Sequence, residues 1–265
     1  MAGSPGRRPT GSRPSSLARS DVLPRSDVMG EPQDAPAEAR RRRLLYGRRK
    51  GPKLSAHQTQ LLETLLPKLR LALQPGADPR NYFSSGTISD VWLEVGFGAG
   101  EHLLWQAEHH PIVGIIGAEP YISGIAKLLS KLLLSPAGRR ESNIRIYDND
   151  AREILEALPD ACLGRAFILF PDPWPKSRHH KRRFIQMNTL DVLARVMKPG
   201  AELRFASDDA DYAAWTLERI TAYPAFEWTA TRTQDWKARP PDWPQTRYET
   251  KALHGPPAYF SFLRR

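Results

Sequence analysis

The sequence predicts an α/β protein with a doubly wound, mostly parallel, Rossmann-like sheet, and three observations indicate this class. From residue 88 onward, short apolar stretches alternate with amphipathic stretches of helical spacing. Buried strands separated by helices are typical of a parallel sheet that is covered on both faces. The chain has 265 residues, and the part that remains after a polar front segment is the length of one domain.

The elements follow one another in a regular order. Leucines at helical spacing in 57–73 predict a first helix that packs on the core. A long loop rich in Pro and Trp separates the last two strands, which we expect to close the sheet with an antiparallel edge strand. The seven predicted strands cover residues 88–96, 112–119, 143–149, 166–170, 202–207, 226–230 and 258–263. The helices between them cover residues 102–110, 121–134, 151–158, 184–197 and 211–223.

The front of the chain differs from the rest in composition. Residues 1–38 mix Pro, Gly, Ser and Arg with few large apolar side chains, which predicts a disordered tail before one domain at 39–265. The chain carries 39 Lys and Arg against 29 Asp and Glu, and no acid stands between Glu38 and Glu63. The basic stretch 39–54 therefore predicts a polyanionic partner such as nucleic acid, although a solvated arm has the same composition.

Other features exclude several classes of site. Cys162 is the single cysteine, so an internal disulfide is excluded, and no Cys/His grouping has metal-ligand spacing, so we expect no metal. No apolar run reaches membrane-spanning length and no secretory signal is recognisable, which predicts a cytoplasmic protein. Nothing requires a partner subunit, so we expect a monomer or a homodimer.

The first predicted strand ends in a glycine-rich turn with Glu94, Gly96, Gly98 and Gly100. Glycines let the backbone turn tightly and approach a ligand, although a tight turn without cofactor uses them too. A dinucleotide site would need another glycine where Glu101 stands, and an acid there repels a diphosphate. S-adenosylmethionine carries no phosphate, and Glu94 can meet its sulfonium or amino group, so this cofactor is favoured.

Acids also follow the next two strands, at the sheet edge where such folds bind ligands. Glu119 stands where nucleoside-binding sheets place an acceptor for ribose hydroxyls, or it is only an acid before the next helix. In the triplet Asp148-Asn149-Asp150, Asp150 is the better candidate for the adenine amino group, and it is equally a candidate N-cap.

The fourth strand is followed by the most specific segment, Phe170 to Lys176, with the sequence FPDPWPK. Prolines on both sides of Asp172 predict a stiff turn that holds this acid at the sheet edge, and Trp174 offers a wall for a base. The basic run SRHHKRR comes next, and we expect it to grip phosphates beside the same pocket.

These motifs, together with GAEP, ASDD and the segment TRYE near the end, resemble the bacterial tRNA (guanine-N7-)-methyltransferase family from about residue 40 to the C-terminus. The resemblance implies a class I methyltransferase fold and transfer of a methyl group from S-adenosylmethionine to N7 of a variable-loop guanine in tRNA. It implies that S-adenosylmethionine contacts Glu94, Glu119, Asp150 and Asp172, with Asp172 also catalytic. Asn149 stays an alternative to Asp150 for the adenine contact. The positions implied to bind substrate are Lys176, Asp208, Thr246, Arg247, Tyr248 and Glu249.

Three other functions compete with this interpretation. A methyltransferase acting on another structured RNA keeps the cofactor, but the PDPW and TRYE segments disfavour it. A basic RNA-binding protein with a degenerate cofactor pocket would not need acids at an RNA-facing edge. Glu101 disfavours a nicotinamide oxidoreductase.

Overall fold

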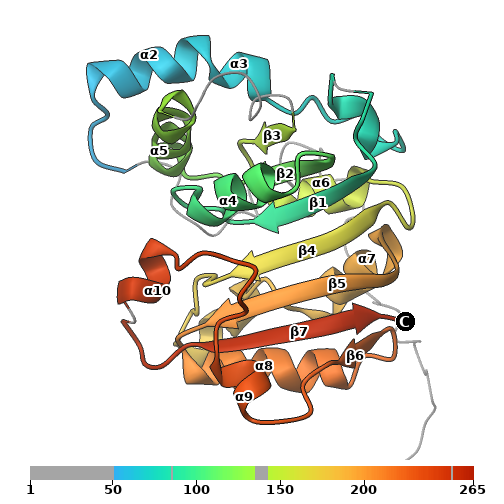
Figure 1. The fold of residues 1–265 in the computed structure, drawn as a ribbon. Coiled ribbons are helices and arrows are strands. Elements are labelled where there is room, and N and C mark those ends of the chain that lie inside the picture. The colour runs from blue at the N-terminus through green and yellow to red at the C-terminus, as the bar shows by residue number, and fades with distance from the viewer. Residues whose placement is uncertain (1–50, 85, 135–142, 252) are drawn as a thin grey trace, which may run out of the picture.

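The computed structural model describes residues 51–84, 86–134, 143–251 and 253–265. The predicted tail, residues 1–38, and residues 39–50 of the basic stretch lie outside these ranges. Figure 1 shows one twisted sheet through the middle of the molecule with helices on both of its faces.

The described chain forms a seven-stranded sheet in the order β3-β2-β1-β4-β5-β7-β6. The five strands β1 to β5 pair in parallel, and β7 pairs antiparallel with both β5 and β6. This arrangement confirms the predicted doubly wound, mostly parallel sheet closed by antiparallel strands. The strands are β1 (Asp90–Val95), β2 (Val113–Ala118), β3 (Ile144–Tyr147), β4 (Leu163–Leu169), β5 (Met197–Ser207), β6 (Phe226–Trp228) and β7 (Ala258–Arg264).

Two clusters of buried residues cover the two faces of the sheet. On one face, Trp92 of β1 packs with residues of α4 and α5 and with leucines of α2 and α3. On the other, Val91 and Leu93 of the same strand pack with α6, α7 and α8. Alternate residues of one strand thus enter opposite cores, as a sheet covered on both faces requires. The main helices are α4 (Glu101–His109), α5 (Ile122–Leu133), α6 (Ala151–Ala157), α7 (Met187–Val196) and α8 (Ala210–Thr221).

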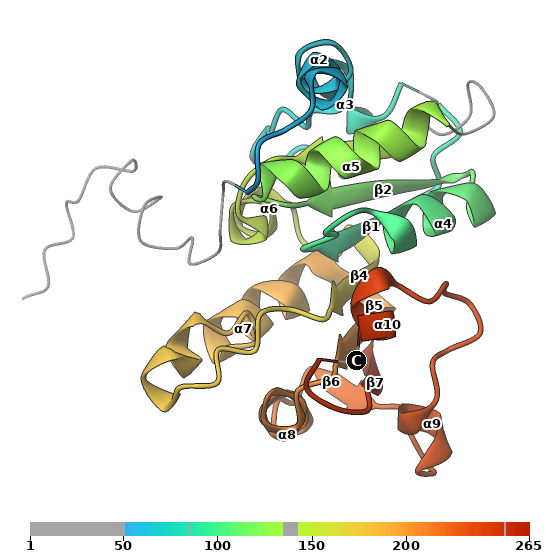
Figure 2. The same ribbon diagram turned by 90° about the vertical axis from the view of Figure 1, so that its left-hand side faces the viewer.

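The first predicted helix is interrupted. The chain forms α2 (Ala56–Thr64) and α3 (Leu66–Leu69), with Leu65 between them. Pro67 stands in the first turn of α3, and its ring has no N–H to continue the hydrogen bonds of α2. The leucine face still packs on the core as predicted, and Figure 2 shows α2 and α3 outside α5, at the end of the molecule opposite α8.

The Pro- and Trp-rich segment between β6 and β7 is not entirely a loop, because it contains the short helices α9 (Gln234–Lys237) and α10 (Arg247–Lys251). The 3₁₀ helices η1 (Pro79–Tyr82) and η2 (Ser177–Arg182) complete the secondary structure of the described ranges. Figure 1 shows α10 at the edge where β4 and β5 end. The last part of the chain is therefore brought to the edge where the predicted acids lie.

Two further observations concern the described residues only. None of their helices is both long and apolar enough to cross a membrane, and none of their His, Cys, Asp and Glu side chains gather in a group of three or more suited to a metal ion. Burial raises the pKa of the Cys162 thiol to about 11, so this side chain stays protonated near neutral pH.

Candidate active site at the carboxyl ends of the strands

The turn after β1 depends on its three glycines. Gly96, Gly98 and Gly100 have φ angles of 72°, 56° and 76°, in the left-handed region that side chains with a Cβ rarely adopt. At two of them neighbouring side chains also leave no room, since a Cβ on Gly98 would lie 2.8 Å from Cε2 of Tyr248 and one on Gly100 would lie 2.5 Å from a methyl group of Leu128. The turn therefore stays open on its pocket side only as long as these positions are glycine.

Glu119 binds this turn from the end of β2. Its Oε2 accepts a hydrogen bond from the backbone N–H of Gly98 at 2.7 Å, and its Oε1 accepts one from Tyr121 at 2.9 Å. The pKa of the Glu119 carboxyl is raised to about 7, because burial and, to a smaller extent, the nearby carboxylates of Asp172 and Glu94 outweigh the two hydrogen bonds, which lower it. The predicted ribose acceptor thus lies at the predicted strand end and also orders the glycine turn.

Glu94 is almost fully buried, with 3% of its surface exposed. Its Oε2 lies 2.8 Å from Nδ1 of His102, a buried side chain in the first turn of α4. The ring of His102 in turn contacts Gln106 at 3.0 Å. Sequence reasoning missed His102, although a polar residue on the buried face of a predicted helix was the signal that could have found it.

The two candidates for the adenine contact differ in position. Asp150 lines the pocket, caps α6 by accepting from the N–H of Arg152 at 3.0 Å, and forms an ion pair with the same arginine. Asn149 instead donates its side-chain amide to Glu153, at 2.9 and 3.1 Å to the two carboxylate oxygens. The predicted N-cap role of Asp150 is confirmed, and Asp150 is the one of the two that reaches the pocket.

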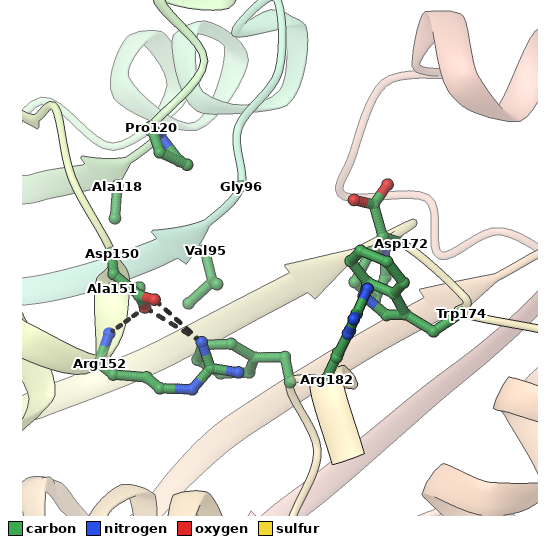
Figure 3. Close-up of a pocket in the computed structure, with 12 residues that line it drawn as sticks. Val95, Gly96, Ala118, Pro120, Asp150, Ala151, Arg152, Asp172, Trp174 and Arg182 are labelled. Atoms are coloured by element: carbon green, nitrogen blue, oxygen red, sulfur yellow. Dashed lines mark hydrogen bonds and ion pairs between the residues drawn. The ribbon is translucent and has the colours of Figure 1, made fainter. Parts of the chain in front are cut away.

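The pocket lies between the ends of β1, β2 and β3 and the segment after β4, and it is lined by Val95, Gly96, Ala118, Pro120, Asp150, Ala151, Arg152, Pro171, Asp172, Trp174, Arg182 and Phe184. Figure 3 shows Asp150 and Arg152 on one side of it and Asp172, Trp174 and Arg182 on the other. Asp172 is exposed, whereas Asp150 is buried. Carboxylates from distant parts of the chain therefore line one pocket from opposite sides, and an aromatic ring lies beside one of them.

The turn that carries Asp172 is strained at both ends. Phe170 and Trp174 have φ angles of 50° and 48°, although neither is glycine. Such conformations cost free energy and persist where surrounding contacts enforce them. Here the guanidinium of Arg182 lies 4.9 Å from the centre of the Trp174 ring, and Nε of Arg183 donates to the carbonyl of Pro173 at 2.8 Å.

The basic run after this turn corrects one expectation. Arg183 is fully buried, pairs with Asp211 and lies over the rings of Tyr212 and Trp215, so it is not available to a phosphate. Its role is to anchor the turn that bears Asp172. Arg178 and Lys181 of the run are exposed, as is Lys176 just before it.

The TRYE segment divides into inward and outward residues. Thr246 and Glu249 cap α10 reciprocally, since each side chain accepts a hydrogen bond from the other's backbone N–H, at 3.2 and 3.3 Å. Glu249 also accepts from the hydroxyl of Tyr259 at 2.7 Å. Arg247 and Tyr248 are exposed, and Tyr248 packs on the glycine turn at Gly98. The substrate roles expected of these residues stay a prediction.

Asp208 and Lys176 complete the expected substrate positions. Asp208 follows β5 and accepts a hydrogen bond from the backbone N–H of His254 at 3.2 Å, which ties the end of β5 to the segment before β7. Lys176 is exposed at the start of η2. Both stand at the carboxyl edge of the sheet, and neither lines the pocket itself.

The chain is similar in sequence to known methyltransferases. The sequence model of a family described as "Putative methyltransferase" matches residues 89–260. A tRNA (guanine-N(7)-)-methyltransferase of Rhodospirillum rubrum is 50% identical over 227 residues, covering 83% of this chain and 87% of that protein. The protein of the same description from Paramagnetospirillum magneticum is 47% identical over 241 residues, covering 89% of this chain and 99% of the relative.

A solved structure supports the fold independently. The crystal structure of the 16S rRNA methyltransferase KamB superposes with a TM-score of 0.51 at 17% sequence identity, covering 73% of this chain and 97% of that one. This likeness concerns the class I methyltransferase fold alone. With the family match over most of the chain and relatives near half identity over nearly their full length, the chain belongs to the tRNA (guanine-N(7)-)-methyltransferase family.

Proposed function

We propose that this chain transfers a methyl group from S-adenosylmethionine to N7 of a guanine in the variable loop of tRNA. The observation that carries the proposal is that Asp150 and Asp172 line the same pocket as Gly96 of the glycine turn, together with Trp174 and Arg182. Acids follow three of the parallel strands at this edge, and carboxylates gathered at one site favour a cationic ligand.

The residues fit S-adenosylmethionine, which when bound supplies a methyl group on a positively charged sulfur. Gly96 lines the pocket, and a Cβ built on it would meet no protein atom within 4 Å, so the backbone is open to a ligand there. We assign Asp150, which lines the pocket, to the adenine amino group and Glu119 to the ribose hydroxyls. Glu94, two residues before Gly96, is assigned to the amino or sulfonium group as a negative charge.

Guanine N7 carries a lone pair that is free of a proton at neutral pH, so its methylation needs no strong base. The work of the site is therefore to orient the purine and to stabilise the positive charge that develops on it. We assign Asp172 to the guanine N1 and N2 edge or to that developing charge, and the face of Trp174 to the wall against the base. We assign Lys176 to a phosphate or to guanine O6.

The substrate must present an unpaired guanine, because N7 lies in the deep, narrow groove of an A-form helix. A guanine in the variable loop can turn toward the pocket. Lys176, Arg178 and Lys181 offer exposed charge beside the pocket for the backbone, and the cations of 39–54 would add to it. Because tRNA is the substrate, we place the enzyme in the cytoplasm, as a monomer or homodimer.

The proposal is tested by incubating the full chain with methyl-labelled S-adenosylmethionine and unmodified tRNA transcripts. Nucleoside analysis should find the label in 7-methylguanosine. Transcripts in which each variable-loop guanine is replaced in turn by adenine should lose the label at one position. Label in another nucleoside would contradict the N7 assignment, and label that survives every replacement would contradict the variable loop.

A further inference from the structure

We propose that His102 is a positioning residue for methyl transfer, and that it is held as a neutral imidazole which orients Glu94 without cancelling its negative charge. The inference rests on the proposed binding of a cationic methyl donor beside Glu94. It concerns a side chain that lines no wall of the pocket and acts only through the carboxylate it contacts.

The contacts form one buried chain from β1 to the segment before α10. Glu94, His102 and Gln106 are 3%, 2% and 0% exposed. Nδ1 of His102 lies 2.8 Å from Oε2 of Glu94, and Nε2 of His102 lies 3.0 Å from Nε2 of Gln106. The same Gln106 nitrogen lies 3.1 Å from the carbonyl oxygen of Asp242. Water has little access to the side chains of Glu94, His102 and Gln106.

The last contact fixes the positions of the protons. A backbone carbonyl can only accept, so the Gln106 atom beside Asp242 must be the amide nitrogen, which donates. That nitrogen has a second hydrogen, and Nε2 of His102 lies where it can accept it. Nε2 therefore carries no proton, and the single ring proton is on Nδ1, donated to Glu94. An imidazolium would set two donors against each other at 3.0 Å.

The surroundings hold the ring in this orientation. His102 packs edge-on against Phe167 and Trp243, with ring centres 4.6 and 5.6 Å away. The carboxylate of Asp242 is bound by the guanidinium of Arg204 at 2.8 and 2.7 Å, which fixes the carbonyl that accepts from Gln106. The segment that leads into α10 thus helps to position an acid of the glycine turn.

The consequence is electrostatic. A neutral imidazole leaves the Glu94 and His102 pair with a net charge of −1, whereas an imidazolium would leave it at zero. The charge stands two residues before Gly96, and it is close enough to Glu119 to raise the pKa of that carboxyl. Glu94 thereby offers a fixed negative charge to the sulfonium, which distinguishes the methyl donor from its uncharged thioether product.

The tautomer can be determined directly by nitrogen NMR of the full chain labelled with ¹⁵N-histidine, with the His102 signals assigned by their loss in His102→Asn. At neutral pH we expect a protonated Nδ1 and an unprotonated Nε2. A ring with both nitrogens protonated, or with the proton on Nε2, would overturn the inference whatever the enzyme's activity.

The effect on Glu94 is tested by two variants. His102→Phe keeps a ring among Phe167 and Trp243 but donates nothing, whereas His102→Asn places an amide N–H near the former Nδ1. Dissociation constants are measured for S-adenosylmethionine and for S-adenosylhomocysteine, which lacks the charge. We expect His102→Phe to weaken binding of the methyl donor about tenfold more than binding of the product. His102→Asn should recover most of the lost affinity for the methyl donor. Thermal melts establish that both variants fold.

The exposed His57 of α2 provides the matched control, because His57→Phe should change neither affinity. Equal weakening of both ligands by His102→Phe would overturn the inference, since it would mean a structural role only. A wild-type chain that binds neither ligand would instead overturn the proposed function, so the two failures are distinguishable.

Discussion

The carboxylate of Glu119 and the backbone N–H of Gly98 are joined by a buried hydrogen bond of 2.7 Å. This contact connects the end of β2 to the turn after β1, and it lies in the region where neighbouring acids oppose ionisation. The turn that would receive the cofactor is therefore ordered by a group whose charge changes near neutral pH.

Glu119 should make the ligand-free protein less stable as pH rises. Its pKa is raised from 4.5 to about 7 in the folded chain, so between these values the folded state binds more protons than the unfolded state. The stabilisation is complete below pH 4.5 and is lost as pH rises through about 7, with a maximum of ~3 kcal/mol. Denaturant titrations from about pH 5 to 8 should show this loss in the wild type and not in Glu119→Gln. Parallel pH profiles for the two proteins would contradict it, and the exposed Glu156→Gln serves as control.

Replacing Asp172 by alanine should remove turnover but leave cofactor binding. The side chain is exposed at the pocket mouth, so its loss disturbs little packing. Loss of a group that stabilises developing charge costs about 10²–10³-fold in rate. Single-turnover assays check the loss of turnover, and equilibrium binding of S-adenosylmethionine checks that the cofactor still binds. Asp160→Ala, at the opposite end of β4, should leave both unchanged. Full activity in the Asp172 variant would remove it from the mechanism.

Much of the fold could be predicted because its signals are local. Apolar strands and amphipathic helices alternate visibly, and the carboxyl ends of parallel strands meet at one edge, so acids placed there had to gather. The break between α2 and α3 was also readable, because Pro67 interrupts the leucine pattern. The helices α9 and α10 have too few turns to produce a period and were missed.

The contacts of the site acids could not be predicted, because they join distant parts of the chain. Asp242 follows Gln106 by 136 residues, and no spacing rule connects them. The prediction that the whole basic run binds phosphates was wrong at Arg183 for a related reason. Arg183 has the same composition around it as its neighbours, and only the position of Tyr212 and Asp211 on α8 decides that this one arginine is buried.

Gly98→Ala should weaken both the fold and cofactor binding. A residue with a Cβ there must adopt the left-handed conformation, which costs about 1–2 kcal/mol, and its Cβ pushes against the ring of Tyr248 of α10, which packs on the glycine turn. Gly76 has a φ of 76°, but a Cβ added to it would have no atom within 4 Å, so Gly76→Ala should show a similar loss of stability with unchanged affinity. Thermal melts and S-adenosylmethionine titrations of the two variants separate these effects. Equal affinities would mean that the turn does not touch the cofactor.

Arg183→Met should release the turn that carries Asp172. The methionine fills part of the space between Tyr212 and Trp215, but the carbonyl of Pro173 loses its donor and Asp211 loses its ion pair. Hydrogen bonds to a buried charge contribute about 1.5–3 kcal/mol each, and Asp211 is largely exposed, so we expect a loss of about 2–4 kcal/mol in the free energy of unfolding.

The Arg183→Met variant should also be less active at temperatures where it is fully folded, so the loss of stability cannot explain the lower rate. The reason is that Arg183 enforces the strained conformations of Phe170 and Trp174. Rates measured well below the midpoint of unfolding test this, with the exposed Arg178→Met as the matched control. If the Arg183 variant lost stability but turned over at the wild-type rate when folded, the strain at this turn would be held by its prolines and by Arg182 instead, and the anchor would be structural only.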